Sequence, residues 1–170
     1  MILDFSRIKN NKNLLAFSGG VDSSALFFLL LNHKIDFDIA IVNYNTREQS
    51  KDEIAYALNL AKEYKKEIFI KDVKLENSSN FEKNARDIRY GFFEQIIKEN
   101  SYETLITAHQ LNDRLEWFLM QLSKGAGLVE LFGIREFEEK KDYKIFRPLL
   151  NVSKDELENY LKENKIKYFI

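Results

Sequence analysis

The sequence predicts an α/β fold in which a doubly wound parallel sheet carries helices on both faces. Short apolar runs alternate four times with longer segments whose apolar residues recur every three or four positions, a pattern typical of strand–helix repeats. Six glycines and one proline in 170 residues are too few for a many-turned all-β fold. The length corresponds to one domain with a single core.

Apolar patterning defines the first two strand–helix pairs. Residues 14–17 form a short apolar run that predicts a strand, and residues 23–33 are apolar enough to predict a buried helix. The segment DIAIVN at 38–43 is rich in β-branched residues and predicts a second strand. In residues 50–64 the apolar positions lie three or four apart, which predicts an amphipathic helix.

The third pair has a recognisable helix start. Residues 67–71 predict a strand. Ser79, followed three residues later by Glu82, matches the capping box and predicts a helix over 81–100.

The fourth pair ends at a glycine-containing turn. Residues 104–108 predict a strand, and residues 111–123 predict a helix with Leu115, Leu119 and Leu122 on one stripe. The segment KGAG then ends this helix, with a glycine at the position that favours left-handed backbone. In such sheets, ligands bind at the carboxyl ends of strands, where the strand order reverses.

The C-terminal part of the chain is less regular. The run EFEEKKDY at 136–143 predicts a charged, solvated turn, although basic residues near it offer an alternative edge for RNA phosphates. Residues 144–146 predict a short strand, and Ser153 starts a final capped helix. The closing IKYFI at 166–170 predicts the beginning of a strand.

Composition excludes several classes of protein. The absence of cysteine excludes disulfide frameworks, cysteine-ligated metals and thiol nucleophiles, and it fits a cytoplasmic location. A net charge of −1 gives no overall attraction to nucleic acid, so such binding needs a local patch. The longest apolar run, 25–31, is too short to cross a membrane, and no signal-peptide pattern is visible at the N-terminus.

The strongest functional signal is SGGVDSS, which joins the first expected strand to the first expected helix. Adjacent glycines bring backbone N–H groups close to an anion, and the helix N-terminus and serine hydroxyls favour it further. The motif lacks the lysine of a Walker A loop. The alternative is a simple capped turn. The candidate phosphate-binding residues are Ser18, Gly19, Gly20, Val21, Asp22, Ser23 and Ser24.

Two further groups of polar residues are candidates for the same site. Arg86 and Arg89 share a helix face and suit a phosphate or carboxylate, although surface arginines show the same spacing. His109 follows the fourth strand, and Asp113 and Glu116 share a face of the next helix. We expect this second group to face the SGGVDSS loop, whereas a lone histidine there is more often structural.

SGGVDSS resembles the pyrophosphate-binding loop of the N-type ATP pyrophosphatases, the PP-loop superfamily. That resemblance implies a Rossmann-like fold of the adenine nucleotide alpha-hydrolase type. It also implies that ATP is cleaved between its α- and β-phosphates, that the loop holds the leaving pyrophosphate, and that Asp22 acts through Mg²⁺.

The order of SGGVDSS, NARDIRY, TAHQLNDRLE and KGAG is similar to that in the tRNA(Ile)-lysidine synthetase family, over about residues 14–165. The resemblance implies that the wobble cytidine of tRNA(Ile) is adenylated and that the amine of L-lysine then displaces AMP. Asp22, Arg86, His109, Asp113 and Glu116 would be the catalytic residues. Residues 1–170 would form a single catalytic domain without that family's C-terminal tRNA-binding domains. A homodimer is a further expectation.

Three alternatives stay open at this point. One is another PP-loop enzyme, for tRNA thiolation or amidation, although many thiolation enzymes use cysteines and this chain has none. The others are a non-catalytic nucleotide-binding module and a degraded paralogue that binds a protein partner.

Overall fold

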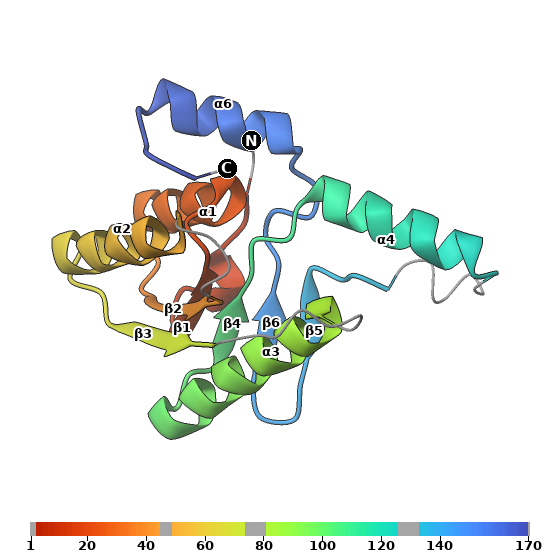
Figure 1. Ribbon diagram of the computed structural model, residues 1–170, viewed down its shortest axis with the longest axis horizontal. Helices are drawn as coiled ribbons and strands as arrows, with labels where there is room; N and C mark the ends of the chain where they lie inside the picture. The colour runs from red at the N-terminus through yellow and green to blue at the C-terminus, as the bar shows by residue number, and fades with distance from the viewer. Residues whose placement is uncertain (1–2, 45–48, 74–80, 126–132, 170) are drawn as a thin grey trace.

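A six-stranded, mostly parallel sheet forms the centre of the molecule (Figure 1). The computed structural model describes residues 3–44, 49–73, 81–125 and 133–169. The strand order is β3-β2-β1-β4-β6-β5. The strands are β1 (Asn13–Phe17), β2 (Asp38–Asn43), β3 (Ile68–Asp72), β4 (Thr104–Ile106), β5 (Phe137–Glu139) and β6 (Lys144–Phe146). The order reverses between β1 and β4, which places a ligand site at the carboxyl ends of those two strands.

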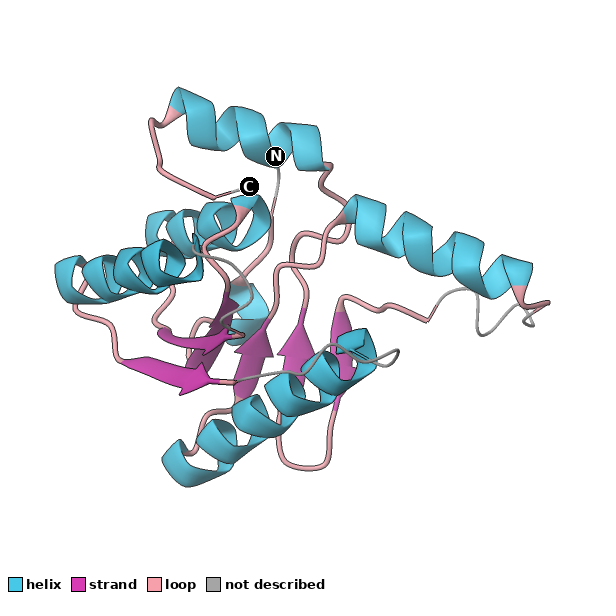
Figure 2. Ribbon diagram, in the orientation of Figure 1, coloured by secondary structure: helices cyan, strands magenta, loops and turns pink. Residues whose placement is uncertain are grey.

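Helices cover both faces of this sheet, as the sequence predicts (Figure 2). The described helices are the short 3-10 helix η1 (Ser6–Ile8), α1 (Val21–Asn32), α2 (Gln49–Glu63), α3 (Phe81–Asn100), α4 (Leu111–Ser123) and α6 (Lys154–Glu163). Helices α1, α2 and α6 lie on one side, α3 lies on the other, and α4 extends away from the sheet. None of these helices has the length and apolar composition needed to cross a membrane.

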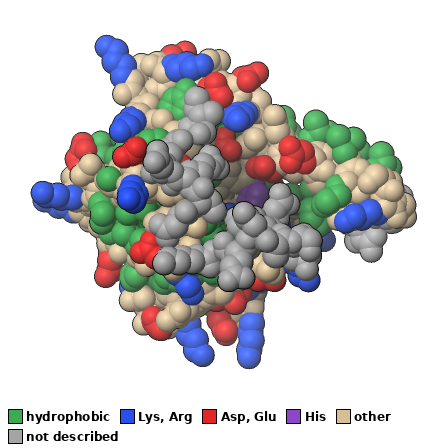
Figure 3. All heavy atoms as spheres, in the orientation of Figure 1, with side chains coloured by type: hydrophobic (Ala, Val, Ile, Leu, Met, Phe, Trp, Pro, Cys, Tyr) green, Lys and Arg blue, Asp and Glu red, His purple; other side chains and the backbone are tan. Residues whose placement is uncertain are grey.

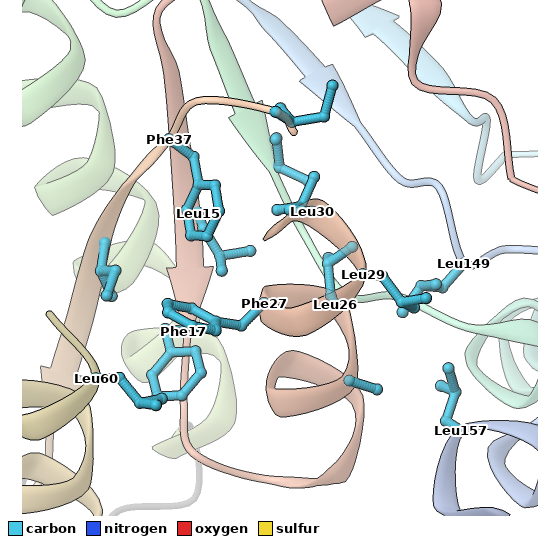
Figure 4. Packing of buried hydrophobic residues seen from close by; sticks show 14 of the residues in the cluster. Leu15, Phe17, Leu26, Phe27, Leu29, Leu30, Phe37, Leu60, Leu149 and Leu157 are labelled. Atoms are coloured by element: carbon cyan, nitrogen blue, oxygen red, sulfur yellow. The ribbon is translucent and has the colours of Figure 1, made fainter. Parts of the chain in front are cut away.

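The side chains of β1 point alternately to the two faces of the sheet and so belong to two separate core clusters. Leu15 and Phe17 pack on the side of α1 and α2, whereas Leu14 packs with α3 on the other side. In Figure 4, Phe17 lies beside Phe27 of α1, and the two rings are 5.9 Å apart. Helix α1 is apolar almost throughout because it lies between β1 and α6. Each fully buried leucine contributes about 1.5–3 kcal/mol, so this cluster holds the start of α1 firmly.

The predicted strands and helices are largely confirmed, and the first of three corrections concerns the charged run. Residues 136–143 contain β5, which pairs antiparallel with β6 at the edge of the sheet. The ring of Phe137 stacks on Phe146 at 4.3 Å, and Arg7 covers its other face at 3.8 Å. These ring contacts stabilise a strand where the surrounding charges indicate a turn.

Two further segments differ from the prediction: the end of β4 and residues 166–169. Strand β4 ends at Ile106, two residues before the predicted end at residue 108. The N–H of Thr107 still donates to the carbonyl of Phe146. Residues 166–169 form no strand of the sheet. Instead Phe169 makes an isolated parallel bridge with Gly20.

Helix ends follow the predicted capping patterns where the structure describes them. Ser153 and Glu156 cap α6 reciprocally, and Gly125 adopts a φ of +69° just after Lys124, the C-cap of α4. The predicted cap at Ser79 and the second glycine of KGAG lie outside the described residues.

Candidate active site

Serine hydroxyls fix the shape of the loop between β1 and α1. The hydroxyls of Ser18 and Ser23 lie 3.0 Å apart, and the hydroxyl of Ser24 donates to the carbonyl of Gly19 at 3.2 Å. Gly19 has a φ of +79°, which a residue with a side chain rarely adopts. The loop therefore wraps around the N-terminus of α1, where backbone N–H groups and the helix dipole attract an anion.

This loop borders a cavity of about 250 Å³ at the point where the strand order reverses. The opposite wall carries His109 and Asp113, as the sequence predicts, and Arg89 also lines the cavity. Figure 3 shows a histidine side chain in a hollow close to acidic side chains. The structure thus brings the candidate phosphate-binding groups and the titratable side chains to one place.

Asp22 points into this region from the first turn of α1. Its Oδ1 is buried without a hydrogen-bond partner. Burial raises the pKa of this carboxyl, and the nearby Asp113 carboxylate raises it further, while Lys154 opposes the shift. A carboxylate in this position is suited to a divalent cation.

The donor set fits Mg²⁺ only together with a phosphate-bearing ligand. Among the described residues, no group of three histidine, aspartate or glutamate side chains is arranged to hold a metal by itself. Mg²⁺ is usually bound by one or two carboxylates, substrate phosphates and water. Asp22 could supply such a carboxylate beside the candidate phosphate loop.

His109 is held in an uncharged form. Its Nδ1 is hydrogen-bonded to the hydroxyl of Thr107 at 2.9 Å. Burial, and next the guanidinium of Arg147, lower the pKa of His109 to about 4. At pH 7 the ring is therefore neutral and adds no charge to the cavity.

Asp113 has a structural role in addition to its place in the cavity. Its Oδ2 accepts a hydrogen bond from the N–H of Gln110 at 2.8 Å, and the side chain of Gln110 accepts one from Asn112 at 2.7 Å. These bonds form a reciprocal cap at the start of α4. The cap orients the first turn of the helix so that Asp113 faces the loop.

A second cavity, of about 430 Å³, adjoins the first through His109 and Asp113. Arg86, Glu116 and Arg147 line it. Arg147 is buried, donates to the carbonyl of Arg135 and to Glu138, and keeps a buried Nε without a partner. This cavity therefore presents both acidic and cationic groups to a ligand.

The model of the PP-loop domain family matches residues 2–170. The chain belongs to this family. Its membership supports the ATP binding that the loop predicts. A tRNA(Ile)-lysidine synthase from Campylobacter jejuni RM1221 is 56% identical over 162 residues, which cover 95% of this chain and 50% of that protein. A synthase of the same name from Helicobacter pylori 26695 is 53% identical, covering 93% and 47%. The chain thus spans about half the length of these relatives.

Solved structures of other PP-loop proteins share the fold. The U34-tRNA thiolase of Methanococcus maripaludis superposes with a TM-score of 0.81 at 23% identity, covering 98% of this chain and 61% of that one. The NH3-dependent NAD synthetase of Campylobacter jejuni has a TM-score of 0.59 at 17% identity, covering 94% and 68%. At these identities the likeness concerns the fold alone.

The PP-loop domain brings most of the predicted site residues together, but it divides the arginine pair. Arg89 lines the first cavity and Arg86 the second. Two residues that the sequence did not single out for the site are Arg147 and Phe169. Arg147 precedes the only proline of the chain, but its positive charge makes the sequence group it with the charged, solvated residues 136–143. Nothing in the local sequence connects Phe169 with the loop.

Proposed function

We propose that this PP-loop domain is the ATP-using part of a tRNA(Ile)-lysidine synthase. It would adenylate the wobble cytidine of tRNA(Ile) and then join L-lysine to it, with release of pyrophosphate and AMP. The observation that carries the proposal is the identity of about half the residues to synthases of that name over nearly the whole chain. A loop and carboxylates that face each other across one cavity support it, because they would supply the chemistry that such a reaction needs.

In the first step, an oxygen of the cytidine base attacks the α-phosphorus of ATP. The new oxygen–phosphorus bond forms as the bond to the bridging oxygen breaks, and pyrophosphate leaves. The N–H groups and hydroxyls of the Ser18–Ser24 loop would stabilise the leaving charge. Mg²⁺, held by Asp22 and phosphate oxygens, would neutralise part of that charge when bound. Arg86, which lines the adjoining second cavity, would contact the α-phosphate or the adenylated base.

In the second step, the amine of lysine attacks the activated ring carbon and AMP leaves. The second cavity suits an amino acid, because Asp113 and Glu116 would attract an amine while Arg86 and Arg147 would attract a carboxylate. One of the two carboxylates would accept the proton that the amine loses. The neutral ring of His109 lies between the two cavities and adds no charge that would repel the amine.

The Asp22→Ala variant tests this assignment. With ATP, tRNA(Ile) and lysine present, we expect release of pyrophosphate to fall by at least about 100-fold, as is usual when a transition-state contact is lost. Asp142→Ala, at an exposed aspartate, is the matched control and should leave the rate unchanged. Unchanged pyrophosphate release by Asp22→Ala would show that the loop assignment is wrong.

Dependence on lysine separates this function from its alternatives. A thiolation or amidation enzyme of the PP-loop family would turn over ATP with a sulfur or ammonia donor instead, and a binding module would not turn it over. The cytoplasmic location and the homodimer stay predictions from the sequence.

A further inference from the structure

The segment Lys167–Phe169 lies against the phosphate loop, although the two are far apart in the sequence. The backbone N–H of Phe169 donates to the carbonyl of Gly19 at 2.9 Å, and Phe169 forms a parallel bridge with Gly20. In Figure 1 the loop that follows α6 runs back toward α1. The loop is therefore supported from outside its own strand and helix.

This hydrogen bond fixes the orientation of the peptide between Gly19 and Gly20. The Gly19 carbonyl accepts from both Phe169 and the hydroxyl of Ser24. Because a trans peptide is planar, its N–H points opposite to its carbonyl. The Gly20 N–H accordingly points toward the hydroxyl of Ser18, 3.4 Å away, and both residues line the first cavity. A flipped peptide would turn a carbonyl oxygen toward a phosphate and repel it.

Contacts with α2 hold the segment in place. The hydroxyl of Tyr56 donates to the carbonyl of Lys167, and the ring of Tyr56 packs against that of Phe169 at 5.7 Å. Phe169 also lies against the glycine loop, since a Cβ added to Gly19 would meet its ring at 3.5 Å. Tyr56 is itself buried in the core. The buried Tyr56 therefore restrains the segment Lys167–Phe169, and the segment in turn restrains the loop.

We propose that Phe169 is a positioning residue for the phosphate loop. Its N–H keeps the Gly19–Gly20 peptide in the orientation that binds an anion. Its ring closes one side of a third cavity, of about 260 Å³, which shares Ser18 and Gly20 with the first. The inference rests on the proposed function only in that the loop binds the phosphates of ATP.

Two substitutions at one position separate the N–H from the ring. Phe169→Ala removes the ring and keeps the N–H, whereas Phe169→Pro removes both. The measurements are the Kd of ATP with Mg²⁺ by calorimetry, the separate KM for ATP and kcat, and urea unfolding without ligand. We expect Phe169→Pro to bind ATP about tenfold more weakly than Phe169→Ala, mainly through KM, with similar unfolding midpoints. Equal ATP affinities of the two variants would overturn the proposal.

A second pair of variants keeps the test decisive if Phe169→Pro fails to fold. Tyr56→Phe loses the hydroxyl that anchors Lys167 and should weaken ATP binding about threefold. Tyr64→Phe, at the residue that follows α2, is the control and should bind ATP normally. Equal affinities of Tyr56→Phe and Tyr64→Phe would then overturn the proposal.

These outcomes are distinct from failure of the proposed function. If the wild-type chain binds ATP but shows no lysine-dependent turnover with tRNA(Ile), the lysidine assignment is wrong and the role of Phe169 stands. If Phe169→Pro and Phe169→Ala bind ATP equally, the role of Phe169 is wrong and the lysidine assignment stands.

Discussion

One oxygen of Asp22, Oδ1, is buried without a partner, and burial raises the pKa of the Asp22 carboxyl, to which the nearby carboxylates of Asp113 and Glu158 add. A raised carboxyl pKa means that the charged form is less favourable in the folded chain than in the unfolded one. A charged Asp22 therefore lowers the free energy of unfolding of the chain at pH 7. A cation and a phosphate would offset that loss on binding.

Asp22→Asn should consequently stabilise the free protein while it impairs function. The amide has nearly the same shape but carries no charge, so we expect the free energy of unfolding at pH 7 to rise by about 0.5–2 kcal/mol. Urea unfolding without ligand measures it, with Asp142→Asn as the exposed control. A lower stability of Asp22→Asn than of the wild type would contradict this account of the charge.

His109 predicts a specific dependence of stability on pH. Its pKa is about 4 in the folded chain and near 6.5 when unfolded. Between these values the unfolded chain binds a proton that the folded chain does not, so stability falls as the pH decreases from 6.5 to 4. His109→Gln removes this contribution. We expect the stability difference between variant and wild type to change by on the order of 3 kcal/mol between pH 7 and pH 4. Parallel stability profiles over that range would contradict it.

Individual residues differ in how far the sequence predicts their place. Ser18, Gly19 and Gly20 are predictable because the motif that defines their backbone is contiguous. Arg147 and Phe169 are not, because each acquires its neighbours from distant parts of the chain. A side chain whose role depends on tertiary contacts carries no local signal.

At the level of the element, α4 depends on a cap that also belongs to the site. Asp113 caps the N–H of Gln110 and lines both of the cavities that adjoin at His109. A loss of activity on substitution can therefore arise from a displaced helix or from a lost charge. The two causes need separate variants.

Asp113→Asn and Asp113→Ala distinguish them. The asparagine keeps an oxygen that can accept from the Gln110 N–H, so we expect stability close to that of the wild type. The alanine loses the cap, which should lower the free energy of unfolding by about 0.5–2 kcal/mol. If the carboxylate handles the lysine amine, both variants should lose lysine-dependent AMP release. Full activity of Asp113→Asn would instead limit Asp113 to capping.

The elements themselves were predictable wherever pattern and burial agree. Helix α1 is apolar because it is buried, and its position follows from its sequence. Strand β5 is not predictable in this way, because stacking of Phe137 on Phe146 outweighs the charges around it. For α4 the apolar stripe was predicted, yet Leu115 and Leu119 are 55% and 54% exposed. Periodicity identifies a stripe but does not show what covers it.

At the level of the whole molecule, strand order explains why residues far apart meet. Parallel pairing of β1 with both β2 and β4 brings the carboxyl ends of β1 and β4 side by side. The Ser18 loop and His109 follow these two ends, so the topology alone places them across one cavity. Motif order along the chain was sufficient to predict this, because right-handed crossovers leave few alternative arrangements.

The distribution of charge gives a last prediction, that this chain binds ATP with Mg²⁺ but binds tRNA weakly. The net charge is −1, and three basic residues in or beside the charged run form ion pairs, Lys140 and Arg147 with Glu138, and Lys144 with Glu139. Because these ion pairs reduce the positive charge that this edge offers to phosphates, we expect counterion release to contribute little to RNA binding. Fluorescence anisotropy at physiological salt should give a Kd for tRNA(Ile) of about 1 µM or weaker, with a non-cognate tRNA bound equally. Calorimetry on the same preparation should show ATP binding, because the candidate phosphate loop and the cavity beside it both lie within this chain. Selective tRNA(Ile) binding far below 1 µM would instead require a basic surface elsewhere on this chain.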